Sequence, residues 1–195
     1  MECTQCERCG KQCRDHGMIT LSESDGRHSE TICGDCYNEE MAEALEVEDF
    51  KNFDSHIIIK DCDNIEHIFE VRKMTHGTGI FWEAIEFLDD DNIGYSFQVY
   101  QGFEDKPEEA VKNLNQKIKN GISKKFIKRT SFGGQESLSF SEDVVEGKIE
   151  WDDRYDGRIP KFKIDGVDYT AEQIGNMLMA YEGWNFELKI KEPTD

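Results

Sequence analysis

Apolar and polar residues alternate in four stretches in the middle of the chain, and these stretches are rich in β-branched and aromatic side chains. They span residues 56–60, 66–74, 79–88 and 94–103. Alternation with period two is typical of strands, and turn-forming segments separate the four stretches. The pattern predicts a four-strand meander, whose third strand carries apolar residues on both faces.

A helix is predicted after the meander, beginning at Pro107 and ending at Gly121. Proline is favoured at the first position of a helix, and glycine is common where a helix ends. Val111, Leu114 and Ile118 recur at helical spacing and form one apolar stripe. We expect this stripe to pack on the sheet.

Residues 131–157 are rich in serine, glycine and acidic residues, which favours a linker. Two short segments within them, residues 137–140 and 147–151, could instead pair with each other as strands. The next segment with a clear strand pattern begins at residue 162.

Residues 162–169 predict a hairpin with an Asp-Gly turn. Thr170 and Gln173 then form the capping box of a helix that ends at Gly183. Residues 184–190 alternate again and predict a returning strand. We expect a β-β-α-β unit, which either completes the preceding sheet or stands beside it.

The first 36 residues hold six of the seven cysteines of the chain. Cys6 and Cys9 precede Gly10, an arrangement typical of a zinc knuckle, in which two thiolates lie on a tight turn. Residues 18–21 and 31–32 then predict a hairpin that turns at Asp25-Gly26.

Cys33 and Cys36 form a second Cys-x-x-Cys pair, directly ahead of a predicted helix. The helix dipole favours the thiolate form at this end. One face of the helix carries Tyr37, Met41, Ala44 and Leu45. This order of elements, in which a zinc knuckle is followed by a hairpin and then a helix, predicts a treble-clef zinc finger.

Together these elements predict an α+β protein, with an N-terminal treble-clef zinc finger followed by an antiparallel sheet with two helices. We divide it into a four-cysteine zinc-finger module at residues 1–52, a four-strand meander plus helix at 53–130, and the β-β-α-β unit at 131–195. The third unit is expected to be separate or part of the same α+β domain as the second.

The composition favours a folded, strongly solvated protein, with 37% hydrophobic residues, 33% charged residues and a mean hydropathy of -0.71 over 195 residues. The sequence has neither an apolar run of membrane-spanning length nor a secretory signal. We therefore expect a cytoplasmic protein, where thiols stay reduced and clustered cysteines indicate metal rather than disulfides.

Cys6, Cys9, Cys33 and Cys36 are the predicted metal ligands. Two Cys-x-x-Cys pairs suit the tetrahedral thiolate coordination of closed structural zinc sites, so the predicted metal is zinc.

Other ligand choices stay open at this point. Cys3 and Cys6 also have Cys-x-x-Cys spacing, and Cys13, His16 and His28 lie near enough in sequence to replace a ligand or to form a second site. The spacing is equally compatible with iron–sulfur ligation.

No catalytic residue is predicted. His28 and Glu30 have the His-x-Glu spacing of zinc deaminases, but they lie too close to Cys33 to form that arrangement. Cys62 and the histidines at positions 56, 67 and 76 are interpreted as ordinary surface residues. Residues 89–92 lack the spacing of a calcium loop and are interpreted as a turn.

The net charge of -19 opposes contact with nucleic acid or an anionic membrane. The leading hypothesis is therefore a non-enzymatic zinc-binding protein that acts through protein–protein contacts of an acidic surface. The stretch from Lys117 to Arg129 contains six basic residues and no acidic one, so a nucleic-acid-linked regulator is the first alternative. An enzyme with an unrecognised site is the second.

The spacing of Cys6, Cys9, Gly10, Cys33 and Cys36 resembles the N-terminal finger of the bacterial protein-arginine-kinase activator, and this resemblance implies metal binding only. The whole chain, notably residues 164–190, resembles small bacterial proteins of a domain-of-unknown-function family with an N-terminal cysteine finger. That resemblance implies no activity and no catalytic residue.

Overall fold

The computed structural model describes residues 3–22, 29–47, 50, 53, 55–88 and 92–194. In this part of the chain the fold is α+β, and all strand pairs are antiparallel. The three α-helices are α1 (Gly34–Ala44), α2 (Pro107–Gly121) and α3 (Ala171–Leu178). None of the described helices has the length and apolar character needed to cross a membrane.

The central feature is a four-stranded sheet in which neighbouring strands in sequence are also neighbours in space. Its strands are β5 (Ser55–Lys60), β6 (Glu66–His76), β7 (Gly79–Phe87) and β8 (Ile93–Gly102). The four strands lie close to the predicted limits, and β7 is largely buried on both faces as expected. β5 pairs only with the first half of β6, up to Val71, so no described strand covers that edge of the second half of β6.

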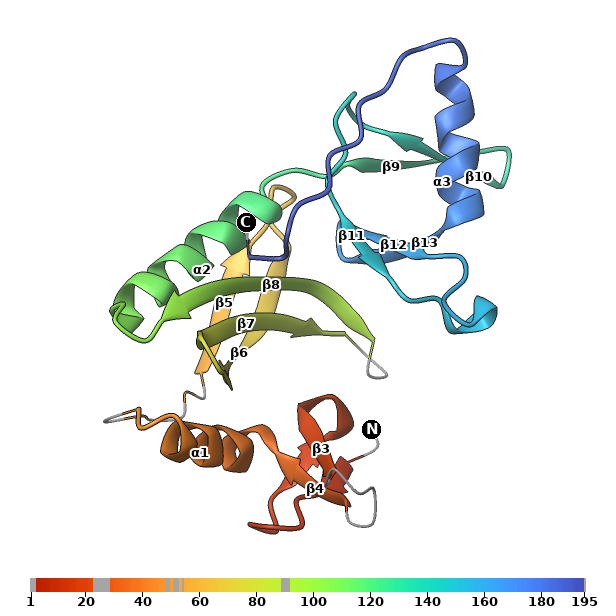
Figure 1. Cartoon of the computed structure of the whole chain (residues 1–195). Coiled ribbons are helices and arrows are strands. Elements are labelled where there is room, and N and C mark those ends of the chain that lie inside the picture. The colour runs from red at the N-terminus through yellow and green to blue at the C-terminus, as the bar shows by residue number, and fades with distance from the viewer. Residues whose placement is uncertain are drawn as a thin grey trace.

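Helix α2 covers one face of the sheet (Figure 1). It begins at Pro107 and ends at Gly121, as predicted. Leu114 and Ile118 are fully buried against Phe69 and Trp82 of the sheet. This apolar cluster is the largest of three in the described structure.

The cysteine-rich N-terminal part lies on the opposite side of the sheet from α2 (Figure 1). It contains β1 (Cys3–Gln5), β2 (Gln12–Arg14), the 3-10 helix η1 (Asp15–Gly17), β3 (Met18–Ser22), β4 (Ser29–Cys33) and α1. β1 pairs with β2, and β3 pairs with β4. The two hairpins and the following helix agree with the predicted order, while the expected turn at Asp25-Gly26 lies outside the described residues.

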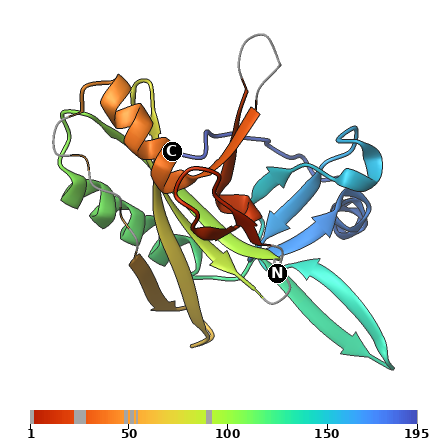
Figure 2. The same cartoon turned by 90° about the horizontal axis from the view of Figure 1, so that it is seen from below.

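The C-terminal part forms two further small sheets. Its elements are β9 (Ile127–Phe132), β10 (Gln135–Phe140), β11 (Lys148–Glu150), η3 (Asp153–Tyr155), β12 (Lys161–Ile164), β13 (Val167–Thr170), α3 and η4 (Met179–Tyr181). The β9–β10 hairpin projects as a ribbon (Figure 2), and β11, β12 and β13 form a three-stranded sheet. Thr170 and Gln173 make the predicted capping box of α3.

The strand pairings of this part differ from those that the sequence suggests. The segments near 137–140 and 147–151 do form strands, but each has another partner: β10 pairs with β9, and β11 pairs with β12. The expected boundary after residue 130 therefore lies inside β9. The β12–β13 hairpin does not complete the four-stranded sheet, since it pairs with β11 instead.

The expected strand at residues 184–190 does not form. These residues are irregular and exposed. Their alternating pattern defines an apolar face, but a strand also needs the backbone of a neighbour, and no described strand of the chain lies paired with them.

Candidate metal centre

Cys6 and Cys9 lie on a tight turn between β1 and β2. The Gly10 amide donates to the Cys6 carbonyl at 2.9 Å, and the Cys6 amide donates to the Lys11 carbonyl at 2.9 Å. Gly10 has a φ of 76°, in the left-handed region that glycine adopts without strain. This turn explains why glycine follows the first pair of cysteines.

Cys33 and Cys36 lie where a strand becomes a helix. Cys33 ends β4 and caps α1 with extended backbone angles, and Cys36 follows in the first turn. The first amides of a helix have no partner within it, and the positive end of its dipole stabilises nearby anions. Burial nevertheless raises the pKa of both Cys33 and Cys36, so the helix end alone does not ionise this second pair of thiols.

The structure brings the four predicted ligands together. Cys6 Sγ lies 3.8 Å from Cys36 Sγ, and Cys9 Sγ lies 3.7 Å from Cys33 Sγ. All four sulfur atoms lie within 4.8 Å of one another. A tetrahedral site with zinc–sulfur bonds of about 2.3 Å has sulfur–sulfur edges of about 3.8 Å. The four thiols can thus hold a metal ion, and the two shortest sulfur–sulfur distances are compatible with a tetrathiolate zinc site.

Backbone amides stabilise the thiolate form of Cys6 in particular. The side chain is 1% exposed, and burial alone raises its pKa. The amides of Cys9 and Cys33 donate to its sulfur at 3.5 and 3.2 Å and lower the pKa to about 6. Burial and the neighbouring thiols raise the pKa of Cys36, so a bound cation is needed to ionise the full set.

Three ion pairs connect the elements that surround the four sulfur atoms. Arg8, on the turn of the first pair, lies 2.6 Å from Glu30 of β4 and 2.7 Å from Glu40 of α1. Lys11 lies 2.9 Å from Asp35 of α1. Exposed ion pairs contribute little singly, but this set links the knuckle to both other elements.

The alternative ligands do not join the cluster. Cys3 is exposed, and Cys13 lies opposite Thr4 in the β1–β2 hairpin and packs beside the four cysteines, partly buried. Among the residues that the structure describes, only Cys6, Cys9, Cys33 and Cys36 bring three or more potential ligand atoms close enough to one another to share a metal ion. His28 lies outside the described residues.

His16 has a packing role instead. Its ring meets the ring of Phe87 edge-on, with 4.9 Å between centroids. Burial, followed by the charge of Arg72, lowers its pKa to about 4, so the ring is neutral at pH 7. His16 thus helps to attach the N-terminal part to the sheet.

Asn38 of α1 makes the most specific contact between the N-terminal part and the sheet. Its side-chain amide donates to the Lys73 carbonyl at 3.0 Å, and the Thr75 amide donates to its side-chain oxygen at 2.8 Å. Both backbone groups belong to β6 beyond the end of β5. Asn38 is 3% exposed and replaces a missing strand at this edge. The sequence gives no signal for this role, because a single asparagine beside the apolar face of a helix is not part of any recognisable pattern.

A second group of ionisable side chains, which we term the Asp61 cluster, is buried at the end of the sheet. It comprises Asp61, His67, Glu86, Tyr95 and Lys125. His67 Nδ1 lies 2.6 Å from Glu86, and His67 Nε2 lies 3.2 Å from Asp61. Lys125 Nζ lies 2.8 Å from Asp61 and 2.9 Å from the Tyr95 hydroxyl.

Opposite charges compensate one another within the Asp61 cluster. Burial alone raises the pKa of Asp61, but hydrogen bonds from Lys125, the Ile65 amide and His67 outweigh burial and hold the pKa well below its usual range. Hydrogen bonds to Asp61 and Tyr95 outweigh burial at Lys125 and raise its pKa. The interpretation of His67 as a surface residue was therefore wrong, since it is 9% exposed and has two carboxylate partners.

The Asp61 cluster also joins two parts of the chain. Asp61, His67, Glu86 and Tyr95 belong to the sheet region, whereas Lys125 begins the C-terminal part. No run of the sequence signals the cluster, because its members lie far apart along the chain. Every charged member has a partner within it, which indicates a structural role.

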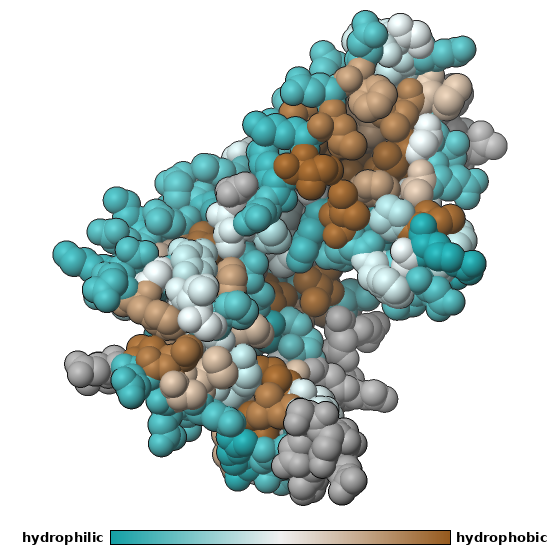
Figure 3. Space-filling model, in the orientation of Figure 1, coloured by the Kyte–Doolittle hydropathy of each residue, from teal (hydrophilic) through white to brown (hydrophobic). Residues whose placement is uncertain are grey.

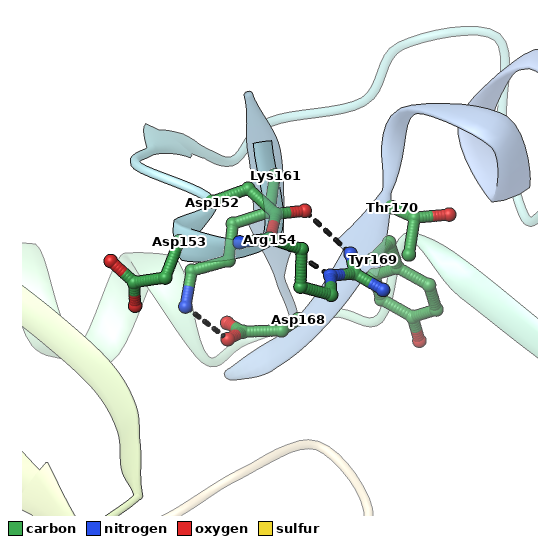
Figure 4. Close-up of a pocket in the computed structure, with 7 residues that line it drawn as sticks. All are labelled: Asp152, Asp153, Arg154, Lys161, Asp168, Tyr169 and Thr170. Carbon is green, nitrogen blue, oxygen red and sulfur yellow. Dashed lines mark hydrogen bonds and ion pairs between the residues drawn. The ribbon is translucent and has the colours of Figure 1, made fainter. Parts of the chain in front are cut away.

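A depression of about 320 Å³ lies between η3 and the β12–β13 hairpin (Figure 4). Its charged side chains bond to one another: Arg154 Nε donates to Asp152 at 2.8 Å, and Lys161 donates to Asp168 at 2.7 Å. Lys163 also pairs with Asp168. These pairs compensate the charges of Asp152, Arg154, Lys161 and Asp168, which indicates a stabilising function for these four residues.

The basic stretch from Lys117 to Arg129 spans several elements rather than one face. Lys124 lies 3.4 Å from Glu142, Lys125 belongs to the Asp61 cluster, and Arg129 donates to the Tyr169 hydroxyl at 3.3 Å. Several of its charges are thus bonded within the protein.

Comparison with known proteins places three domain families along the chain. Residues 5–48 match Domain of unknown function (DUF7685), residues 51–123 match Domain of unknown function (DUF7686), and residues 126–195 match Domain of unknown function (DUF7713). No curated protein and no solved structure matches the chain. The chain is thus similar to uncharacterised domains throughout.

Proposed function

We propose that the protein binds one zinc ion through Cys6, Cys9, Cys33 and Cys36, and that this zinc is structural. The observation that carries the proposal is the close approach of four sulfur atoms from two Cys-x-x-Cys pairs, all within 4.8 Å of one another. Four protein ligands fill a tetrahedral zinc site and leave no open position for substrate. The metal would hold the knuckle, the β3–β4 hairpin and α1 together as a treble-clef finger.

The proposed finger acts as one unit because its pieces have little core of their own. Its buried residues are three of the four cysteines (Cys6, Cys33 and Cys36) together with Ile32, Ala42 and Asn38. Small modules of this kind obtain much of their folding free energy from metal binding. Zinc would thereby position Asn38 and His16 for contact with the sheet.

We further propose that the protein acts through protein–protein contacts in the cytoplasm. Many large apolar side chains of the C-terminal part are exposed, including Trp151 at 62% and Met179 at 64%. Exposed apolar surface of this kind is typical of interaction sites. The net charge of -19 favours a basic partner over nucleic acid, and seven free thiols suit a reducing compartment.

Metal analysis of protein prepared without chelator tests the proposal. We expect about one zinc per chain. The Cys33→Ser variant should lose this zinc, whereas Cys62→Ser, at an exposed cysteine outside the cluster, should retain it. Less than half an equivalent of zinc in the wild-type protein, or iron in its place, would overturn the assignment.

A further inference from the structure

Residues 184–190 have the side-chain pattern of a strand but none of its backbone bonds. Trp184, Phe186, Leu188 and Ile190 alternate with polar residues. Within the part of the chain that the structure describes, the amides of residues 185–190 make no hydrogen bond to another backbone group. Figure 1 shows the segment as a separate trace that runs from the end of α3 towards α2.

The apolar face of this segment is open to solvent. Trp184 is 67% exposed, Phe186 89%, Leu188 75% and Ile190 66%. Leu178 and Met179 at the end of α3 add further exposed apolar surface, and Figure 3 shows apolar residues gathered over the C-terminal part. An unpaired strand with an exposed apolar face is a template for pairing with another chain.

The charges of the segment are complementary to those of a second copy in one antiparallel register. When Leu188 faces Leu188 of the second copy across a two-fold axis, Glu187 faces Lys189 of the second copy, and the reverse pair forms on the other side of the axis. On the apolar face, Phe186 meets Ile190. Opposite charges and apolar pairs at directly facing positions stabilise antiparallel strands.

Neighbouring registers lack this complementarity. Moving the axis by one residue places either Glu187 or Lys189 opposite its own copy, and like charges at facing positions are unfavourable. The axis at Leu188 also brings the two copies together at a segment in which the charges of Glu187 and Lys189 cancel each other. The whole chain, by contrast, carries a net charge of -19. The facing residues on either side of the axis therefore add no net charge to the interface.

We propose that the protein forms a two-fold symmetric dimer, in which residues 184–190 of two copies pair as antiparallel strands about Leu188. Such an interface is self-complementary, as two-fold symmetry requires. It supplies the backbone partner that the segment lacks within the described part of its own chain. The proposal does not depend on the metal centre.

The mass of the full-length protein in solution, measured by sedimentation over a range of concentrations, tests the proposal. We expect twice the chain mass of 22.6 kDa for the wild type. Glu187→Lys should produce the monomer, because it places two lysines opposite each other on both sides of the two-fold axis. The double variant Glu187→Lys with Lys189→Glu should restore the dimer.

These substitutions lie on exposed side chains, so the fold should survive them, and circular dichroism checks this. A wild-type monomer at all concentrations would overturn the proposal. A dimer that Glu187→Lys leaves intact would also overturn it, as would a double variant that remains monomeric.

Crosslinking tests the register separately. Directly facing residues of paired strands have Cβ atoms about 5 Å apart, and only Leu188 faces its own copy. Under mild oxidation Leu188→Cys should give a covalent dimer well above the wild-type background of the native cysteines, whereas the matched variant Phe186→Cys should not. Equal crosslinking of the two variants would refute the register.

Discussion

Asn38 offers the clearest test of how the N-terminal part is attached to the sheet. In the Asn38→Ala variant the Lys73 carbonyl and the Thr75 amide lose the hydrogen bonds that the Asn38 side chain makes with them. Thr75 is fully buried, so water cannot reach its amide without opening the contact.

The size of the effect follows from the groups that lose these bonds. A buried polar group without a partner costs about 1–3 kcal/mol. Lys73 is only partly buried and can regain water, so we expect a total loss of about 2–3 kcal/mol in the free energy of unfolding. This is a large share of the ~5–15 kcal/mol that stabilises a typical domain.

Urea unfolding followed by tryptophan fluorescence measures this loss. Trp82 is buried in the sheet at 1% exposure, whereas Trp151 and Trp184 are 62% and 67% exposed, so the signal change reports mainly on the sheet. Asn115→Ala is the matched control, because the Asn115 side chain bonds a carbonyl of its own helix and does not bridge two parts of the fold. If Asn38→Ala costs no more than this control, the bridging role of Asn38 is refuted.

Three further predictions concern the charges and the metal. Asp61→Asn should lower the free energy of unfolding by about 3 kcal/mol at pH 7, because Lys125 loses its buried partner. The pKa of Asp61 is depressed in the folded state, so its contribution to the free energy of unfolding is present above the unfolded pKa of about 3.9 and is lost as the pH falls from there through the folded pKa. The difference in the free energy of unfolding between the variant and the wild type should therefore shrink below a pH of about 3.9. A constant difference down to the acid limit of folding would refute the role given to Asp61. Chelation should reduce helical circular dichroism while Trp82 stays buried, and simultaneous loss of both signals would mean that finger and sheet unfold as one unit. Duplex DNA should bind no tighter than roughly 100 μM at physiological salt, and micromolar, steeply salt-dependent binding would favour the nucleic-acid alternative.

The sequence predicts the elements whose signals are local. Period-two alternation predicted the four central strands, proline and glycine predicted both ends of α2, and the capping box predicted the start of α3. The two Cys-x-x-Cys pairs predicted the four clustered thiols, because each pair is fixed by its own turn and the β3–β4 hairpin brings the pairs together.

The features that the sequence did not predict depend on partners distant along the chain. β9 has no clear local signal: its first residues belong to the basic stretch that ends at Arg129, its last residues belong to the predicted linker from residue 131, and its strand is defined by pairing with β10. The Asp61 cluster and the Asn38 bridge use polar residues whose burial is set by tertiary contacts. At residues 184–190 the pattern shows an apolar face but cannot show which backbone would pair with it.

X-ray absorption at the zinc edge of the purified full-length protein measures the ligands of the proposed metal centre. We expect four sulfur atoms at about 2.3 Å and no nitrogen or oxygen ligand. A spectrum that requires a histidine nitrogen or a water oxygen would contradict the closed tetrathiolate centre, and protein without zinc would contradict the proposed function itself.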